Sequence, residues 1–148
     1  MEKKYIHYGH KRFDRRLFEP IMNGGCCGVK PYGGFWASPV DAEFGWKDWN
    51  EDSGLMSCTE NNSFTFTLAP ETKILVIDNV NVLDTLPKMP YDGLRIPMWV
   101  ALDFEKIRDS GIDVIEYVLS SDHRLYMALY GWDCDSILIM NPDIVVEE

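Results

Sequence analysis

Residues 30–39, Lys-Pro-Tyr-Gly-Gly-Phe-Trp-Ala-Ser-Pro, bring together side chains that are well suited to ligand chemistry. The glycine pair Gly33-Gly34 permits backbone conformations closed to other residues, so another chain segment or a ligand can approach closely. Ser38 and Pro39 are typical of a helix start, with serine as the N-cap and proline at the first helical position. A hydroxyl and aromatic rings are therefore expected beside a helix N-terminus, where free N–H groups and the helix dipole favour a phosphate-bearing ligand.

A short strand and a helix must position this serine. Residues 35–37 form an apolar run that predicts a buried strand. Beyond the serine, Ala42, Trp46 and Trp49 recur at helical spacing. The sequence thus predicts a strand that ends at Ser38 and a helix that begins directly after it.

The rest of the chain indicates an α+β fold. Residues 5–9 predict a first strand, and the apolar residues of 13–21 recur every four positions, as in an amphipathic helix. Strands and helices then follow one another without a regular βαβ rhythm, which favours α+β over a doubly wound sheet. Further strands are expected at 63–68, 73–78, 112–118 and 137–140, and further helices at 79–86 and 103–110.

The later segments differ in how buried we expect them to be. Residues 63–68 alternate between apolar and polar side chains, which predicts a half-buried strand with an antiparallel neighbour. Residues 73–78 are more uniformly apolar and predict a more fully buried strand than 63–68. The region 79–97, with its prolines, and the region 120–132 are candidates for target recognition and for a flap over a binding cleft.

Composition indicates a single globular domain over residues 1–148. The chain is 46% hydrophobic and 13% aromatic, enough for a real core. Its net charge of −10 makes nucleic-acid backbone binding unfavourable, since that requires a basic face. No apolar run is long enough to span a membrane, and the first residues do not form a signal-peptide pattern. We therefore expect a cytoplasmic protein without a membrane partner.

The four cysteines predict ordinary reduced thiols. Their spacing fits no zinc motif, and the adjacent pair Cys26-Cys27 is poor geometry for a tetrahedral site. A rival hypothesis is a thiol enzyme that pairs one of these cysteines with His7 or His10, although no oxyanion donor is marked in the sequence.

Five short motifs, in their order along the chain, resemble the ADP-ribosyltransferase-like fold, a split β-sheet shared by bacterial toxins, poly-ADP-ribosyl polymerases and small phage or bacterial relatives. The resemblance spans most of the chain. The motifs are His-Tyr-Gly at 7–9, Gly-Phe-Trp-Ala-Ser at 34–38, Lys-Ile-Leu-Val-Ile-Asp at 73–78, the segment 103–115, and an acid just before Ser-Ile-Leu-Ile-Met-Asn-Pro at 136–142. The resemblance implies a single domain with a mixed or antiparallel sheet and an NAD-binding cleft.

The resemblance also implies roles for residues of the first two strands. His7 would hold the nicotinamide ribose, and the Gly9 backbone would meet the nicotinamide amide. Ser38 would lie beside the nicotinamide, with Trp36 or Tyr32 stacking on its ring. Tyr8 and Phe35, which flank these positions, complete the expected NAD-binding set.

The third motif of the family is a carboxylate, usually Glu, at the start of a late strand. Here the matching residue is Asp135, or Asp133 two positions earlier, and Glu116 is a second possible acid. The carboxylate would stabilise the positive charge that develops on the ribose. The implied activity is transfer of ADP-ribose from NAD to a macromolecular target, expected to be a protein, without a metal. The alternative is a catalytically inert member that binds a nucleotide or a protein partner.

Each of these residues also has an ordinary structural interpretation. His7 lies between apolar neighbours on a strand and can be a hydrogen-bonded strand histidine. Ser38 can serve only as a helix cap, and Asp133 and Asp135 can be turn residues ahead of a strand. From the residues alone these interpretations stay open.

Overall fold

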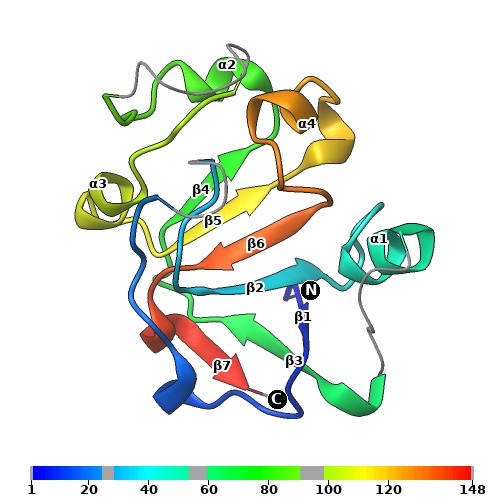
Figure 1. Ribbon diagram of the computed structural model, residues 1–148. Coiled ribbons are helices and arrows are strands. Elements are labelled where there is room, and N and C mark those ends of the chain that lie inside the picture. The colour runs from blue at the N-terminus through cyan, green and yellow to red at the C-terminus, as the bar shows by residue number, and fades with distance from the viewer. Residues whose placement is uncertain (1, 25–28, 54–59, 91–98, 148) are drawn as a thin grey trace.

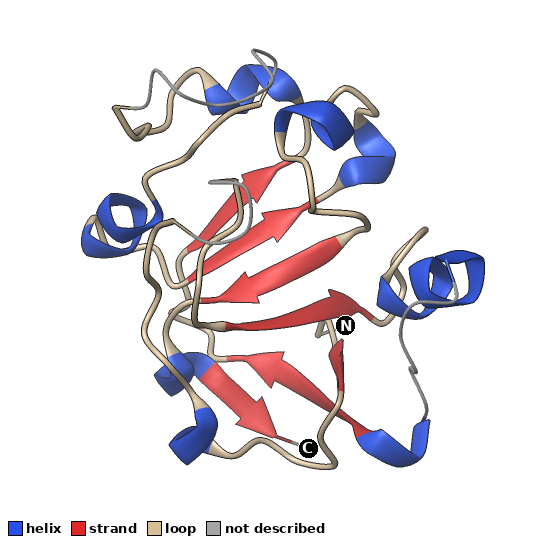
Figure 2. Ribbon diagram, in the orientation of Figure 1, coloured by secondary structure: helices blue, strands red, loops and turns tan. Residues whose placement is uncertain are grey.

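The computed structural model describes residues 2–24, 29–53, 60–90 and 99–147. Seven strands in these residues form one mixed sheet in the order β4-β5-β6-β2-β1-β3-β7, and four α-helices accompany it (Figures 1 and 2). This confirms the α+β class. The strands are β1 Tyr5–Tyr8, β2 Phe35–Pro39, β3 Ser63–Leu68, β4 Ile74–Ile77, β5 Val114–Tyr117, β6 Ser136–Ile139 and β7 Val145–Glu147; the helices are α1 Trp46–Ser53, α2 Val80–Leu83, α3 Phe104–Asp109 and α4 Leu125–Ala128.

The sheet divides into two parts between β1 and β2. These strands pair antiparallel only at Tyr5↔Pro39 and Ile6↔Ser38. Beyond that point β1 stays with β3 along its whole length, while β2 continues beside β6. Apart from the parallel pair β4–β5, all neighbouring strands are antiparallel. The divergence of β1 from β2 is the feature that positions the candidate site.

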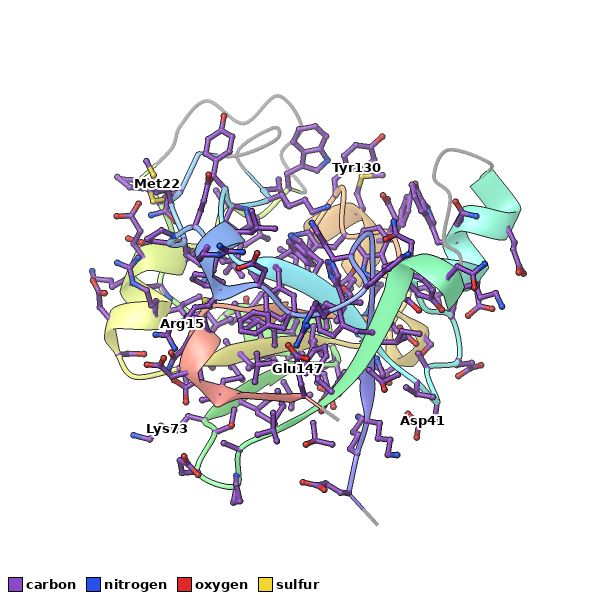
Figure 3. All side chains as sticks on the ribbon, turned by 90° about the horizontal axis from the view of Figure 1, so that it is seen from below. Arg15, Met22, Asp41, Lys73, Tyr130 and Glu147 are labelled. Atoms are coloured by element: carbon purple, nitrogen blue, oxygen red, sulfur yellow. The ribbon has the colours of Figure 1, made fainter. Side chains whose placement is uncertain are left out.

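Two apolar clusters fill the two faces of the sheet, and Figure 3 shows side chains packed on both sides. The larger cluster joins inward side chains of β5 and β6 to helices α2, α3 and α4, with Trp132 among its largest buried members. The smaller cluster lies on the opposite face and includes Tyr5, Phe66 and Ile139. Successive strand residues point to opposite faces, so Trp36 packs on the first cluster and Phe35 on the second.

The glycine pair does bring two backbone segments close together. Gly33 and Gly34 have φ of 77° and 66°, values that L-residues with side chains rarely adopt. A Cβ on Gly33 would lie 2.1 Å from the carbonyl oxygen of Pro20, and Gly34 N–H donates to Glu19 O at 2.7 Å. The glycines therefore let the chain at 19–20 cross the start of β2.

Several element predictions are wrong. The amphipathic helix expected at 13–21 is only a 3₁₀ turn over Arg15–Leu17, which the Asp14 carboxylate caps at Arg16 N–H. Phe13 and Phe18 instead lie against Phe35, so packing across the sheet overrides the helical spacing.

The helix predicted directly after Ser38 begins later. β2 continues to Pro39, and α1 begins at Trp46. Strand β4 is not fully buried, because it is an edge strand with Ile74 and Val76 each 40% exposed. The short strand β7 was not predicted. No helix among the described residues has the length and apolar character needed to cross a membrane.

Candidate functional site

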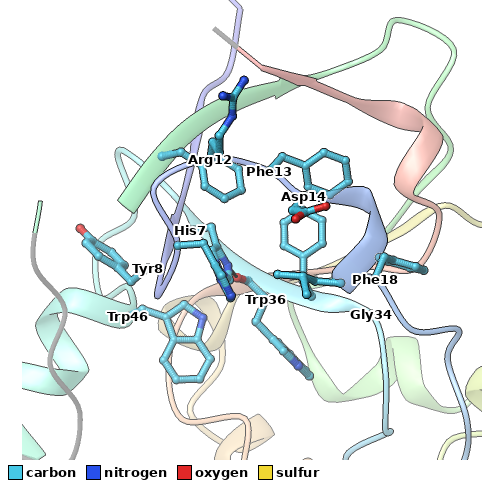
Figure 4. A pocket seen from close by; sticks show the side chains of 13 residues that line it. His7, Tyr8, Arg12, Phe13, Asp14, Phe18, Gly34, Trp36 and Trp46 are labelled. Carbon is cyan, nitrogen blue, oxygen red and sulfur yellow. Dashed lines mark hydrogen bonds between the residues drawn. The ribbon is translucent and has the colours of Figure 1, made fainter. Parts of the chain in front are cut away.

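A pocket of about 380 Å³ opens where β1 leaves β2 (Figure 4). This volume lies in the range of small-molecule sites, about 300–1,000 Å³. Most of the wall is aromatic, contributed by Phe13, Phe18, Phe35, Trp36, Trp46 and Phe64. Such a wall suits a flat ring that can stack or meet aromatic edges.

His7 occupies the point where the two strands separate. Its Nδ1 lies 2.6 Å from the carbonyl oxygen of Trp36, so the side chain reaches across from β1 to the β2 backbone. The imidazole also meets the ring of Phe35 edge-on, with the centroids 5.4 Å apart. Of the residues predicted to hold NAD, His7, Tyr8, Phe35 and Trp36 all line this pocket.

The protonation state of His7 follows from its contacts. A carbonyl oxygen can only accept, so His7 Nδ1 carries the hydrogen in this bond. Burial lowers the pKa of His7 below its ordinary value, partly offset by the bond to Trp36 O, and nearby His10 lowers it further. A neutral ring with Nδ1 protonated leaves Nε2 as an acceptor.

His10 is the partner of that acceptor. Its Nδ1 lies 3.0 Å from His7 Nε2, and the two rings are close to parallel, with centroids 5.2 Å apart and an interplanar angle of 19°. Gly9, with φ of 117°, makes the turn that places His10 beside His7, and its N–H is anchored on Asn62 O. In the sequence His10 was named only as a possible partner of a cysteine, and it was not part of the predicted NAD-binding set.

The pocket has two further charged lining residues, Arg12 and Asp14. Arg16 donates two hydrogen bonds from Nε and Nη2 to the Asp14 carboxylate, each 3.0 Å long. This guanidinium holds the pKa of Asp14 below its ordinary value. Asp14 is therefore ionised at neutral pH, and its charge is offset by Arg16.

A cation also lies on the tryptophan part of the wall. Lys30 Nζ is 4.6 Å from the ring centroid of Trp36 and 5.4 Å from that of Trp46. Both distances are within the range of cation–π attraction. The predicted stacking residue Trp36 thus has the pocket and Lys30 as neighbours.

Ser38 and Asp135 come together, but not with His7. Ser38 is 2% exposed, donates from Oγ to Asp135 O at 2.9 Å, and accepts from Trp46 N–H at 2.9 Å. Ser38 lies within β2 and is not the N-cap of a helix that begins at Pro39, so that prediction is wrong; its hydroxyl instead accepts from the first N–H of α1, eight residues further along the chain. Because Gly45 N–H likewise donates to Asp48, two N–H groups that a phosphate could have used are already bonded.

The Asp135 carboxylate has a full set of protein partners. Its Oδ1 accepts from Ser120 N–H at 2.9 Å, and its Oδ2 accepts from Ser120 Oγ at 2.7 Å and Phe44 N–H at 3.4 Å. The backbone N–H of Asp135 donates to Phe44 O. Asp135 is 4% exposed and is not among the pocket-lining residues. In this geometry it ties the loop before α1 and the turn after β5 to the start of β6.

The remaining predicted residues lie elsewhere. Gly9 forms the turn between His7 and His10 and is not among the pocket-lining residues. Tyr32 is 59% exposed and is also not among them. Glu116 is buried on β5 and accepts from Lys3 Nζ at 2.6 Å. Asp133 is half-buried and outside the described lining. For the rival thiol site, Cys26 and Cys27 lie outside the described residues.

The predicted NAD-binding set omitted seven residues of the described lining that contribute rings or charge: His10, Arg12, Phe13, Asp14, Phe18, Trp46 and Phe64. One usable signal existed, because a histidine three positions after His7 across a glycine can fold back beside it. Phe64 could have been placed by the alternation of β3 once its pairing with β1 was known. Comparisons with protein-family models, with curated proteins and with solved structures gave no match.

Proposed function

We propose that the protein binds NAD in the pocket between β1 and β2 and transfers ADP-ribose to a macromolecular target, expected to be a protein. The observation that carries this proposal is the divergence of β1 from β2, which leaves His7 in an aromatic pocket. A split sheet with a first-strand histidine at the division is what the resemblance to ADP-ribosyltransferase-like proteins implies. The pocket volume suits the nicotinamide ring and its ribose rather than the whole dinucleotide.

The pocket groups suit this half of NAD. Aromatic side chains such as Phe35 and Trp36 can hold the nicotinamide ring by stacking or edge contacts. His7 offers a polar contact for the ribose, and its bond to Trp36 O fixes the orientation of the ring. Fixed placement of the reacting carbon is itself a large part of catalysis.

In the transfer step the bond between nicotinamide and the ribose carbon breaks, and an atom of the target forms a bond to the same carbon. Nicotinamide leaves with the bonding electrons, and the target loses a proton. Positive charge develops on the ribose and is stabilised by a nearby carboxylate. Asp135 is the acid that the resemblance implies, but its oxygens are bonded to Ser120 and Phe44, whereas Asp14 lies in the pocket wall.

The position of Asp135 outside the pocket lining favours a second candidate function, nucleotide binding without transfer. Among the described lining residues Asp14 is the one carboxylate, and Arg16 offsets its charge. A pocket that lacks an uncompensated acid can hold NAD but gives little help to the bond-breaking step.

The test is NAD binding and nicotinamide release by the purified protein, with His7→Ala, Asp135→Asn and Asp14→Asn beside the wild type. His123→Ala is the matched control, because His123 is exposed and outside the pocket lining. We expect His7→Ala to abolish release while His123→Ala leaves it unchanged. The two aspartate variants identify the acid, since loss of release at unchanged thermal stability marks the catalytic one.

Two other outcomes would contradict the transferase proposal. NAD binding without release by the wild type would support the binding module and overturn the transferase. Failure of NAD to bind at all would overturn both.

A further inference from the structure

Two imidazole nitrogens lie next to each other in a wall that is otherwise mostly aromatic. His7 Nε2 and His10 Nδ1 are 3.0 Å apart, and both side chains line the pocket. A pocket of this kind gains its specificity from a small number of placed polar groups. The histidine pair is therefore the natural place to look for recognition of a polar part of the ligand.

The donor and acceptor order of the pair is fixed by its surroundings. Trp36 O requires a hydrogen on His7 Nδ1, so the neutral His7 ring presents Nε2 as an acceptor. The close contact then requires His10 Nδ1 to carry a hydrogen and donate it. Side by side, the pair offers one acceptor and one donor.

We propose that His7 and His10 together recognise the adjacent 2′ and 3′ hydroxyls of the ribose in the pocket. One hydroxyl donates to His7 Nε2, and the other accepts from His10 Nδ1–H, in place of the bond between the rings. This inference rests on the proposed function and makes His10 a specificity-determining residue.

Two other ligands fit the pair less well. A phosphate oxygen needs donors, but His7 Nε2 is an acceptor while the ring is neutral. A catalytic zinc site uses three protein ligands, and the described residues contain no group of three His, Cys, Asp or Glu side chains able to hold a metal. A hydroxyl can both donate and accept, so a pair of hydroxyls satisfies both rings.

The backbone between the rings keeps them in place. Gly9 adopts φ of 117°, and its N–H donates to Asn62 O at 2.8 Å. The His7 ring is fixed by Trp36 O, while His10 is exposed. His10 can therefore turn to a hydroxyl while His7 stays fixed.

The experiment measures binding of NAD and of two NAD analogues that lack the 2′ or the 3′ hydroxyl on the nicotinamide ribose. Quenching of tryptophan fluorescence is a suitable signal, because Trp36 and Trp46 line the pocket. For the wild type we expect each missing hydroxyl to weaken binding about fivefold to tenfold, the value of one hydrogen bond. In His10→Ala the penalty should vanish at one of the two positions and persist at the other.

Two further variants sharpen the readout. His10→Asn keeps an N–H near the position of Nδ1 and should retain part of the discrimination. His123→Ala replaces the remaining histidine of the chain and should keep both penalties in full. Adenosine and its 2′- and 3′-deoxy forms are measured in parallel, as a probe of ribose recognition that does not depend on NAD.

The outcomes separate the two proposals. If NAD binds and His10→Ala keeps both penalties, ribose recognition by the pair is wrong while the proposed function stands. If adenosine shows the penalties that depend on His10 but NAD does not bind, the pair recognises ribose and the transferase proposal is wrong. If neither compound binds, both proposals are overturned.

Discussion

The clusters around His7, on β1, and around Asp135, directly before β6, make opposite use of a polar side chain. Trp36 O and His10 engage the two His7 nitrogens, and His10 itself is exposed at a pocket. The Asp135 carboxylate is buried, and both its oxygens accept hydrogen bonds from neighbouring protein donors. A ligand can replace a partner in the first cluster, whereas the second has no opening in the described pocket.

The difference comes from how many backbone donors lie nearby. At Asp135 the chain supplies the N–H groups of Ser120 and Phe44, so a buried carboxylate is satisfied without solvent or ligand. At His7 the neighbouring strand has diverged, and a side chain replaces the missing strand contact. Asp135, which is surrounded by backbone donors, thus serves to hold the fold together. His7, which lies where two strands separate, is available to bind a ligand.

The largest effect is expected from Asp135→Ala. The change leaves Ser120 N–H and Phe44 N–H without their acceptor in a buried setting, at a cost of about 3 kcal/mol of unfolding free energy. In a chain of this size that corresponds to a fall in Tm of roughly 6–12 °C. Thermal unfolding monitored by circular dichroism measures it.

Asp133→Ala is the matched control and should change unfolding free energy by less than about 0.5 kcal/mol. Asp135→Asn keeps one oxygen and should lie between the two. An unchanged Tm in Asp135→Ala would contradict the structural role of this carboxylate and return Asp135 to the position of catalytic candidate.

Ser38→Ala should have the next largest effect. The hydroxyl links Asp135 O to Trp46 N–H, so its loss removes one buried and one partly buried hydrogen bond and the acceptor at the start of α1. We expect a loss of about 1–2 kcal/mol, measured by urea denaturation. Ser136→Ala, which removes one bond to Cys134 O, should cost about half as much; an equal loss in both variants would argue against the double role of Ser38.

Much of the fold was predictable because local patterns dominate where strands pair regularly. The alternation of 63–68 gave β3 with its bounds, and Asp103 with the glycine at 111 bracketed α3. The 3₁₀ turn at Arg15–Leu17 was not predictable, because the helical spacing of Phe13 and Leu17 is outweighed by contacts of Phe13 and Phe18 with Phe35. The exposure of β4 depends on its place at the sheet edge, which spacing does not encode.

The site was predictable only in part, for a related reason. His7, Tyr8, Phe35 and Trp36 lie on two short strands whose motifs the sequence marks, and all four line the pocket. Other lining residues come from segments that approach only after folding, as Phe64 does through the β1–β3 pairing. The number of donors around Asp135 also depends on long-range contacts, so a spacing argument could not separate a structural carboxylate from a catalytic one.

The smallest effect is the pH dependence of the His7 contribution to stability. Burial lowers the pKa of His7 in the folded protein below the ordinary value of 6.5. As pH falls below 6.5 the unfolded chain takes up a proton that the folded chain resists, so folding stability is lost until the pH passes the folded pKa. The stability difference between wild type and His7→Ala should therefore decrease between pH 8 and pH 5, with unfolding by urea as the measure. Carboxylates common to both chains cancel in this difference. A difference that grows toward pH 5 would mean that folded His7 gains its proton readily, and that Nε2 is not the acceptor on which ribose recognition depends.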